Sequence, residues 1–519
     1  MSTAAAHKLA VSEQPQSHED RAFFGHPRGL STLFFTEMWE RFSYYGMRGF
    51  LILYMTAPAA MGGLGLATPT AAAIYGTYTS MVYLMSLPGG WIADRLIGQR
   101  RAVLYGGMLI AAGHYTLAVP ASAAFYAGLV FIVLGTGLLK PNISVIVGQL
   151  YTEKDIRRDA GFSVFYMGIN LGAFVGPLIT GFLAQDPRFR AWITGLGMDP
   201  NSSWHWGFGA AGVGMTLGLL QYALGAQRLG EAGRHPVKPS SPEAGARLKR
   251  RAVLLLGGGL ALVAALAAAI ATGALPVTPE QISNTYSYIL LAVTVVFFGW
   301  LFTSGNWTPD ERKRLYLIGV FFLAAALFFS VFEQAGSTLN LFADRATRNT
   351  LLGYPFPSSW YQSQNALFII IFAPMFAWLW VRMGMNQPAS PTKFSFGLIG
   401  VGLGFLILIP AAGLAADGTL VSPMWLTVTY LIHTYAELCL SPVGLSSMTK
   451  LAPARIVSLM MGVWFLGASV GNFLGGQAAS FYESMPLAEL FGMVALLPIA
   501  AGILMFLFRR PLTALIGDA

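Results

Sequence analysis

The stretch Glu37-Met-Trp-Glu-Arg-Phe-Ser-Tyr-Tyr-Gly-Met-Arg48 places ionisable side chains inside the first hydrophobic segment of the chain, which runs from Leu30 to about Ala57. These side chains are Glu37, Glu40, Arg41 and Arg48. Each costs about 2.5–3.5 kcal/mol at bilayer depth, so such residues inside an apolar span indicate a function. At about 100° per residue they share one arc of about 100°, while phenylalanines occupy the opposite side. The stretch therefore predicts a helix that lines a polar cavity within a bundle of membrane helices.

The whole chain has the composition of a polytopic helical membrane protein. Of its 519 residues, 55% are hydrophobic and only 11% are charged, whereas globular proteins average about 25% charged residues. The net charge of +9 does not indicate a nucleic-acid partner, because the basic residues are concentrated in short segments between apolar spans, as the positive-inside rule describes. The single cysteine, Cys439, excludes a disulfide within the chain.

Windows of about 20 apolar residues predict fourteen membrane helices. The predicted ranges are 30–57, 70–93, 101–119, 122–150, 160–184, 205–227, 251–273, 285–304, 313–341, 362–382, 394–414, 422–448, 456–482 and 488–508. Alternate connections carry basic residues and are expected in the cytoplasm. These residues include Arg95, Lys154, Lys238, Arg312 and Arg455. An even number of spans then places both termini in the cytoplasm.

The predicted organisation is six helices, an extra pair, and six more helices. The expected parts are a cytoplasmic tail (1–29), a six-helix bundle (30–228), a cytoplasmic linker with the extra pair (229–311), a second six-helix bundle (312–510) and a second tail (511–519). The extra pair has no charge inside its apolar ranges and is expected at the periphery. Two six-helix halves with a site between them at mid-membrane form the all-α major facilitator fold.

The charged residues of the first span suggest proton coupling. Burial favours the neutral form of a carboxyl group, and a neighbouring Arg favours the charged form. An anionic substrate that draws Arg41 away would leave Glu37 or Glu40 protonated, which couples a proton to an anion. The structural alternative is that Glu and Arg one turn apart only neutralise each other and fix how the helix packs.

The stretch 89–101, GGWIADRLIGQRR, lies between the second and third predicted spans. It resembles the loop pattern of the major facilitator superfamily, in which the acidic and basic residues bond across the cytoplasmic ends of neighbouring helices. Asp94 and Arg95 are therefore candidate gating residues. A simple membrane anchor would explain the arginines but not Asp94 or the glycines.

Lys140 lies in the apolar fourth span, before Pro141 and Asn142, and needs a partner there. The carboxylates available in the other half are Glu437 and Glu333. A bridge from Lys140 to one of them would join the halves and form a gate. The alternative is a Lys140 near the membrane surface, whose ammonium group reaches water by snorkelling.

Further polar residues in apolar spans lie one turn apart. Tyr166 and Asn170 share a face of the predicted span 160–184, and Glu437 and Ser441 share a face of the predicted span 422–448. Each pair offers hydrogen bonds to a polar substrate. Hydrogen bonding between helices is the structural alternative. The predicted span 456–482 adds Trp464 and Asn472.

Taken together, these residues resemble the proton-coupled oligopeptide transporter family of the major facilitator superfamily. Its E-x-x-E-R run with a downstream Y-Y-G-M-R is present at Glu37–Arg48, and its F-Y-x-x-I-N signature is present at Phe165–Asn170. Its Asp-Arg loop, Lys-Pro-Asn, Phe-Glu-Gln and Glu-x-x-x-Ser-Pro motifs occur at 94–95, 140–142, 332–334 and 437–442. The resemblance covers about residues 30–510, including the extra helix pair of bacterial members.

The resemblance implies a site that holds both ends of a di- or tripeptide. The residues expected at the peptide carboxylate are Arg41, Arg48 and Lys140. Those expected at the amino terminus are Asn170 and Glu437, with Ser441 beside them. The side-chain pockets would be lined by Tyr45, Tyr78, Tyr166 and Trp464. Glu333 would be a second acidic site that pairs with an Arg or Lys of the first half, and proton coupling would belong to Glu37, Glu40 and Arg41.

Three features depart from the family pattern. Ala173 stands where a serine often follows the F-Y-x-x-I-N signature. Phe329 stands where a tryptophan often lies one turn before the acidic residue of the predicted span 313–341, here Glu333. The second span has no histidine, whereas animal relatives have one implicated in proton handling. The expected proton handling therefore shifts to Glu37 and Glu40.

The sequence thus predicts a proton-driven symporter of di- and tripeptides in the bacterial inner membrane, working as a monomer with protons as the coupling ion and no other cofactor. A carrier for another small solute, such as nitrate or a drug, is the alternative, but Asn170 and Glu437 favour a substrate with an amino terminus. A receptor or scaffold would not need buried charges in both halves. The sequence contains no motif for a metal site or a catalytic nucleophile, so no motif indicates an enzyme.

Overall fold

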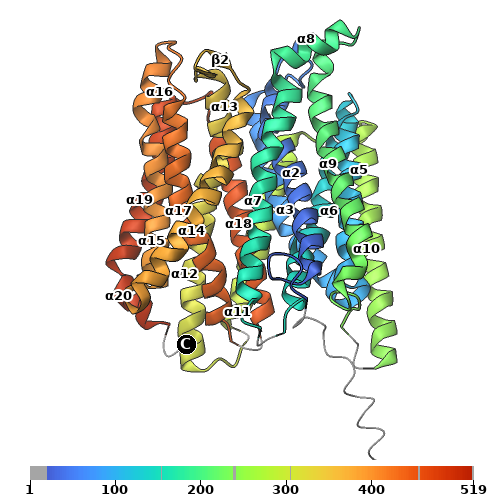
Figure 1. Ribbon diagram of the computed structural model, residues 1–519, viewed down its shortest axis with the longest axis vertical. Helices are drawn as coiled ribbons and strands as arrows, with labels where there is room; N and C mark the ends of the chain where they lie inside the picture. Colours follow the sequence, from blue (N-terminus) through green and yellow to red (C-terminus); the bar gives the residue numbers. More distant parts are fainter. Residues whose placement is uncertain (1–19, 153–154, 238–240, 304, 454–455, 517–519) are drawn as a thin grey trace, which may run out of the picture.

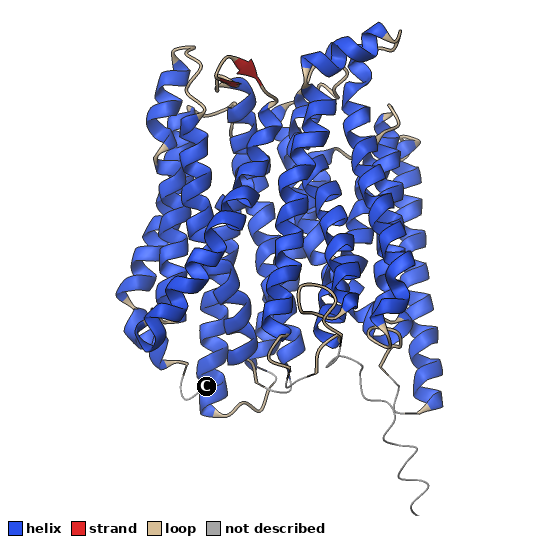
Figure 2. Cartoon of the chain, in the orientation of Figure 1, coloured by secondary structure: helices blue, strands red, loops and turns tan. Residues whose placement is uncertain are grey.

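Most of the chain forms long helices that run between two ends of the molecule (Figures 1 and 2). The computed structural model describes residues 20–516 except 153–154, 238–240, 304 and 454–455. In this part of the chain, nine helices are long and apolar enough to cross a membrane. The predicted cytoplasmic residues Lys154, Lys238 and Arg455 lie outside the described residues.

The helices follow one another in the order of the predicted spans. The first half contains α2 (Arg28–Thr56), α3 (Thr68–Leu84), α4 (Ser86–Ile92), α5 (Gln99–Leu117), α6 (Ser122–Gln149), α7 (Arg158–Gln185), α8 (Pro187–Gly195) and α9 (Ser203–Gly225). The extra pair is α10 (Pro242–Ala271) and α11 (Pro279–Thr303). The second half contains α12 (Pro309–Phe332), η6 (Glu333–Gly336), α13 (Thr338–Arg345), β1 (Thr350–Leu351), β2 (Tyr354–Pro355), η7 (Ser358–Tyr361), α14 (Gln362–Met383), α15 (Ser390–Leu406), α16 (Leu408–Ala416), α17 (Met424–Leu451), α18 (Val457–Ala479), α19 (Leu487–Leu507) and α20 (Arg509–Ala514).

Two predicted spans are broken by proline. A proline ring clashes with the carbonyl group four residues earlier, so a helix tends to end there. Accordingly, α3 ends at Leu84, four residues before Pro88, and α15 ends at Leu406, four residues before Pro410. Each span continues after the break as a second helix, so the path across the molecule is kept.

A third predicted span is broken without a proline, at the turn η6. Here Gly336 lies so close to its neighbours that a Cβ atom would approach Arg48 Nε to 2.9 Å and would also clash with Tyr75. The absence of a side chain lets helices α2 and α3 of the first half reach this turn of the second half. The break therefore positions Glu333, the acidic residue of η6, against Arg48.

Helix α10 begins before the predicted span, whose first residue is 251. It begins at Pro242, with the Ser241 hydroxyl accepting a hydrogen bond from the Ala244 amide as N-cap. A serine N-cap followed by proline is a strong helix start. The basic residues before Arg251 therefore lie on the first turns of α10.

The two halves meet along two pairs of helices, α3 with α18 and α7 with α14. The end of the molecule that carries α8 and the β1–β2 hairpin, at the top of Figure 1, is called the hairpin end below. The opposite end, where α10 and α12 begin, is called the linker end. At the hairpin end, Trp360 donates to the Leu178 carbonyl group (3.0 Å) and Asn340 to that of Gly49 (2.8 Å), so the halves are joined there.

Candidate functional site

The first charged group lies on α2, where Arg41 sits between two carboxylates. Its Nε atom is 3.1 Å from Glu37 Oε1 and in closer contact with Glu40 Oε2, and all three side chains are buried. The second oxygen of each carboxylate and Arg41 Nη2 have no hydrogen-bond partner among the described residues. Two carboxylates beside one guanidinium leave one negative charge in excess, which suits the binding of a proton.

The second charged group joins the halves through Arg48 of α2. Its Nη2 atom is 2.5 Å from Glu333 Oε2 and its Nε donates to the Tyr75 hydroxyl group (2.6 Å). It also donates to the Glu333 backbone carbonyl (3.2 Å). Both side chains are buried, so each charge depends on the other. The expected pairing of Glu333 with a cation of the first half is found in this ion pair.

Lys140 is not paired as the gate hypothesis expected. Its ammonium group lies over the Tyr83 ring, 3.9 Å from the centroid, and 6.0 Å from that of Phe465. The ion pairs of the described residues include none between Lys140 and Glu437 or Glu333, because Glu333 is taken by Arg48. Tyr83 in turn donates to Glu333 Oε1 at 3.4 Å, so one tyrosine connects the lysine with the ion pair. In this conformation a cation–π contact replaces the predicted bridge.

The residues expected at an amino terminus are each bonded within their own half. The amide of Asn170 donates to the Tyr166 carbonyl one turn earlier (2.9 Å), and Glu437 Oε2 accepts from Asn365 (3.1 Å). Ser441, one turn after Glu437, has no hydrogen-bond partner among the described residues. These contacts hold the side chains in place and leave the Asn170 carbonyl oxygen free for other bonds.

Aromatic side chains line the space between these groups. The Arg48 guanidinium lies 5.8 Å from the centre of the Tyr45 ring. The Tyr78 hydroxyl group is buried and has no partner among the described residues. Trp464 packs edge-to-face on Phe329, with centroids 5.7 Å apart, so the residue that departs from the family pattern touches a predicted pocket residue. Tyr166 is 38% exposed.

The candidate gating residues Asp94 and Arg95 lie at the linker end. Asp94 accepts from Gln99 (2.7 Å), and its backbone carbonyl accepts from Val237 (2.8 Å), while Arg95 is exposed. Arg100 of the same loop donates to the Ala232 carbonyl (2.7 Å). The stretch is thus bonded to the segment after α9 and also to two neighbouring helices, since Tyr222 of α9 donates to the Arg100 carbonyl group (3.1 Å) and Asn142 of α6 donates to that of Gly89 (3.3 Å).

Three residues of the site were missed by the sequence reasoning. Tyr75 and Tyr83 were not selected, although they lie eight residues apart on α3. This separation is about two helical turns and places both tyrosines on one side of the helix, a pattern that could have identified them. Asn365 lies in the first turn of α14, where a polar residue is easily taken for the end of a span. Only its contact with Glu437 shows its importance.

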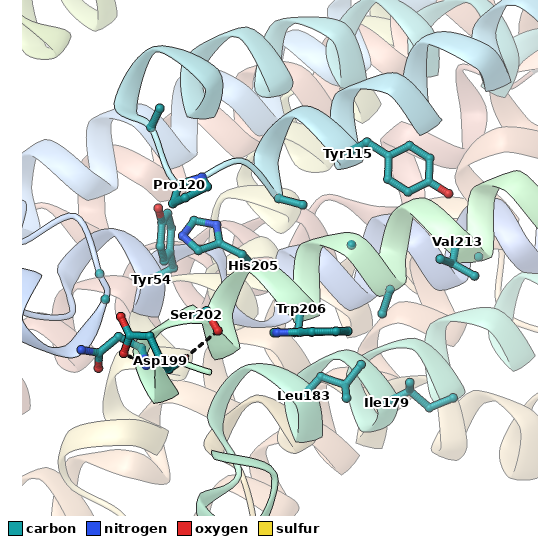
Figure 3. A pocket seen from close by; sticks show the side chains of 18 of the residues that line it. Tyr54, Tyr115, Pro120, Ile179, Leu183, Asp199, Ser202, His205, Trp206 and Val213 are labelled. Carbon is teal, nitrogen blue, oxygen red and sulfur yellow. Dashed lines mark hydrogen bonds between the residues drawn. The ribbon is translucent and has the colours of Figure 1, made fainter. Parts of the chain in front are cut away.

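A cavity lies apart from these charged groups. It is a groove of about 1050 Å³ whose lining comes mainly from α9, with further side chains from α2 and α7. Figure 3 shows its apolar side chains, Ile179, Leu183 and Val213, beside Trp206 and Tyr115, with Asp199 and Ser202 at one end. Trp206 and Val213 are exposed on the outside of the first half. An apolar groove on this outer face suits lipid hydrocarbon rather than a charged substrate.

A polar latch closes the hairpin end between the halves. The Thr68 hydroxyl group at the start of α3 donates to Glu483 Oε1 (2.5 Å), which also accepts from Arg345 Nη1 (2.7 Å). Arg345 donates to Thr68 as well (3.3 Å). The hydrogen bond from Thr68 and those from Arg345 hold the pKa of Glu483 below its usual range, against the opposing effect of burial.

Replacing Glu483 with glutamine is expected to loosen this latch, because the amide loses the charge-assisted bond to Arg345. Amide hydrogen exchange at the start of α3 and in α13 should become faster than in the wild type. Since a lowered pKa keeps the carboxylate charged, the difference should persist between about pH 5 and 8 and vanish only as pH falls through the lowered pKa. The exposed Glu489→Gln at the same end is the control. Equal rates of amide hydrogen exchange in the Glu483→Gln and Glu489→Gln variants would show that Glu483 does not hold the halves together at the hairpin end.

Comparisons with known proteins point in one direction. A sequence model of the POT family matches residues 100–494. The chain is 42% identical to the peptide transporter YePEPT of Yersinia enterocolitica, over 88% of each chain. It is 37% identical to a di-/tripeptide transporter of Lactococcus lactis, over 96% of this chain and 98% of that one. A crystal structure of a POT family transporter in complex with 5-aminolevulinic acid superposes with a TM-score of 0.86, at 36% identity, over 96% of this chain and 100% of that one.

Proposed function

The chain belongs to the POT family, whose members are transporters rather than enzymes, and we propose that it imports di- and tripeptides together with protons. The proposal rests on the charged groups of the site and on the peptide transporters among its relatives. In this proposal the two six-helix halves expose the site alternately to the two sides of a membrane.

The observation that carries the proposal is the ion pair between Arg48 of the first half and Glu333 of the second, at 2.5 Å. A peptide carboxylate is a second partner for Arg48 and competes with Glu333 for it. Because the two partners belong to different halves, this competition weakens a contact that holds the halves together. Binding of the substrate thereby favours the motion that carries it across.

The two ends of a peptide fit opposite sides of the site. A dipeptide carries opposite charges at a short, nearly fixed separation. Arg41, Arg48 and Lys140 offer cations from the first half, and Glu437 offers a carboxylate from the second, with the free carbonyl oxygen of Asn170 as a further acceptor. Aromatic rings such as Tyr45 and Trp464 then meet side chains of many shapes, which favours breadth of substrate over selectivity.

Proton coupling is assigned to the Glu37, Glu40 and Arg41 group. When substrate or motion draws Arg41 away, the two buried carboxylates lose their cation, and taking up a proton becomes favourable. One co-transported proton supplies about 2.3 kcal/mol per 100 mV of membrane potential. That free energy supports roughly fifty-fold accumulation of peptide per proton.

The proposed topology has fourteen membrane spans with both termini in the cytoplasm. The hairpin end then faces outward and the linker end, with its basic residues, faces the cytoplasm. The location is the bacterial inner membrane, and the unit of transport is a single chain.

A carrier for a different small solute is the second candidate. The related POT transporter solved with 5-aminolevulinic acid holds a compound that is not a peptide. That compound still carries an amino group and a carboxylate, the same two ends that Glu437 and Arg48 are proposed to meet. A substrate such as nitrate has no amino group and leaves Glu437 without a role.

A panel of solutes separates these candidates by their effect on thermal unfolding of the purified protein. A ligand that binds the folded state stabilises it by about 2.7 kcal/mol at 100 times its Kd. We expect dialanine and trialanine to raise Tm, while free alanine and nitrate at equal concentration do not. A shift with nitrate and none with either peptide would overturn the proposal.

A further inference from the structure

The extra helix α11 does not lie apart from the two halves; it is bonded to both. On α3 of the first half, Thr77 donates to the hydroxyl group of Ser283 (3.0 Å). On α18 of the second half, Gln477 donates to the same Ser283 (3.4 Å). Ser283 is buried, so this bridge is sheltered from solvent. The helix thus covers the line where α3 and α18 meet.

One turn further along α11, Tyr286 joins a buried cluster of three hydroxyl groups. Its oxygen lies 2.8 Å from Ser80 Oγ and 3.5 Å from Ser469 Oγ, and the two serine oxygens are 2.8 Å apart. Ser469 also donates to the Ser80 carbonyl (2.9 Å). If Ser469 uses its proton there, then Ser80 donates to Ser469 and Tyr286 donates to Ser80, so each of the three hydroxyl groups has an acceptor.

The backbones of α3 and α18 touch beside this cluster. A Cβ atom on Gly76 would lie 2.8 Å from Gly476 Cα, so only glycine permits the approach. Ser80 lies roughly 18 Å along the axis from the start of α3 at Thr68 and roughly 25 Å from the end of the same span at Ile97. The close contact and the hydroxyl cluster therefore lie in the middle of the span, away from both ends.

Two halves that rock against each other must separate at one end and then at the other, while a contact at intermediate depth changes least. The latch of Thr68 and Glu483 lies at an end, and α11 begins near it, where Thr70 donates to Glu280. Ser80, Ser469 and Tyr286 of α11 lie at the middle of the same seam. We propose that α11 is a strap that holds the middle of the α3–α18 seam as the pivot of transport, with Ser283 and Tyr286 as positioning residues. The inference rests on the proposed function, because a pivot has meaning only in a protein whose halves move.

The strap also bears on the substrate site. Tyr75 and Tyr83 are on α3, and Trp464 is on α18, so the seam fixes the distance between aromatic residues of the two halves. None of the hydrogen bonds of α11 described above involves Tyr75, Tyr83 or Trp464. The helix therefore acts on these residues only through α3 and α18, which carry them. Its polar residues therefore position the site rather than bind the peptide.

Two disulfides test whether the seam is a pivot, in a background with Cys439→Ala. The first joins Ser80→Cys to Ser469→Cys, whose oxygens lie 2.8 Å apart in the wild type. The second joins Gly181→Cys on α7 to Ser359→Cys on η7, at the hairpin end, where a Cβ on Gly181 would lie 3.4 Å from Ser359 Cβ. The serine oxygens mark where the two sulfur atoms of the first pair would lie, close to bonding distance, and the Cβ separation of the second pair is near the short end of the range of about 3.5–4.5 Å for disulfides.

We expect oxidation to leave dialanine uptake unchanged in the variant with cysteines at Ser80 and Ser469. Oxidation should stop uptake in the variant with cysteines at Gly181 and Ser359, and a reductant should restore that uptake. Loss of uptake on oxidation of the Ser80–Ser469 pair would overturn the inference, because the seam would then have to open. Failure of the wild type to take up any peptide would instead contradict the proposed function.

A second comparison does not depend on engineered cysteines. Tyr286→Phe removes one buried hydroxyl group, and Tyr288→Phe removes an exposed one two residues away on the same helix. Loss of about one hydrogen bond should raise the KM for dialanine by about fivefold in Tyr286→Phe only, with Vmax kept. It should also speed amide hydrogen exchange around Gly76 and Gly476, a readout that needs no transport. Equal KM and equal exchange in the two variants would show that α11 is not a strap.

Discussion

Replacing Arg48 with alanine is expected to abolish peptide uptake and to lower the free energy of unfolding by about 3–5 kcal/mol, because Glu333 is left buried and unpaired. The ion pair joins helix α2 to the turn η6 at 2.5 Å, and both side chains are buried. The two effects have different origins. The loss of stability comes from the stranded carboxylate, and the loss of uptake comes from the missing partner of the peptide carboxylate.

A double variant separates these origins. Arg48→Met with Glu333→Gln removes both charges and keeps similar volumes, so stability should return toward that of the wild type. Uptake should remain absent, since no cation replaces Arg48. Lys313→Ala, at an ion pair in which both Lys313 and Asp310 are exposed, is the control and should leave stability and uptake nearly unchanged. Recovery of uptake in the double variant would show that Arg48 serves only to neutralise Glu333.

Replacing Glu40 with glutamine is expected to uncouple transport from the proton gradient. Glutamine resembles the protonated acid and holds no proton to release, while Arg41 keeps Glu37 as a partner at 3.1 Å. The wild type should accumulate dialanine roughly fifty-fold per proton at 100 mV, whereas the variant should only equilibrate it. Exchange of labelled for unlabelled dialanine across proteoliposomes, which needs no net proton movement, should persist.

The same pair of assays applied to Glu37→Gln assigns the proton to one of the two carboxylates. The residue whose replacement stops accumulation but not exchange is the carrier. Glu243→Gln, an exposed position at the start of α10, controls for the loss of a negative charge. If Glu40→Gln loses exchange as well as accumulation, Glu40 binds substrate or supports the fold, and the coupling assignment is wrong.

Local patterns were sufficient to predict a chain of long apolar helices and the charged face of α2. Periodicity places Glu37, Glu40 and Arg41 together, since neighbours on a helix follow from spacing alone. The breaks after Leu84 and Leu406 also follow from local chemistry, because Pro88 and Pro410 stand four residues beyond them.

Contacts between distant helices were harder to predict. The partner of Lys140 depends on how α6 faces α3, so the sequence offered two carboxylates and missed the Tyr83 ring. Asn365 was missed for the same reason. The apolar composition of α11 suggested a peripheral helix, but two of its polar residues, Ser283 and Tyr286, meet the seam.

A proton gradient is proposed to drive a peptide through this protein. Proteoliposomes loaded with alkaline buffer and given a negative potential inside test this proposal when labelled dialanine is followed. We expect accumulation above the outside concentration that collapses when a protonophore is added. Uptake that only reaches the outside concentration and ignores the protonophore, or that is replaced by uptake of nitrate, would contradict proton-driven peptide transport.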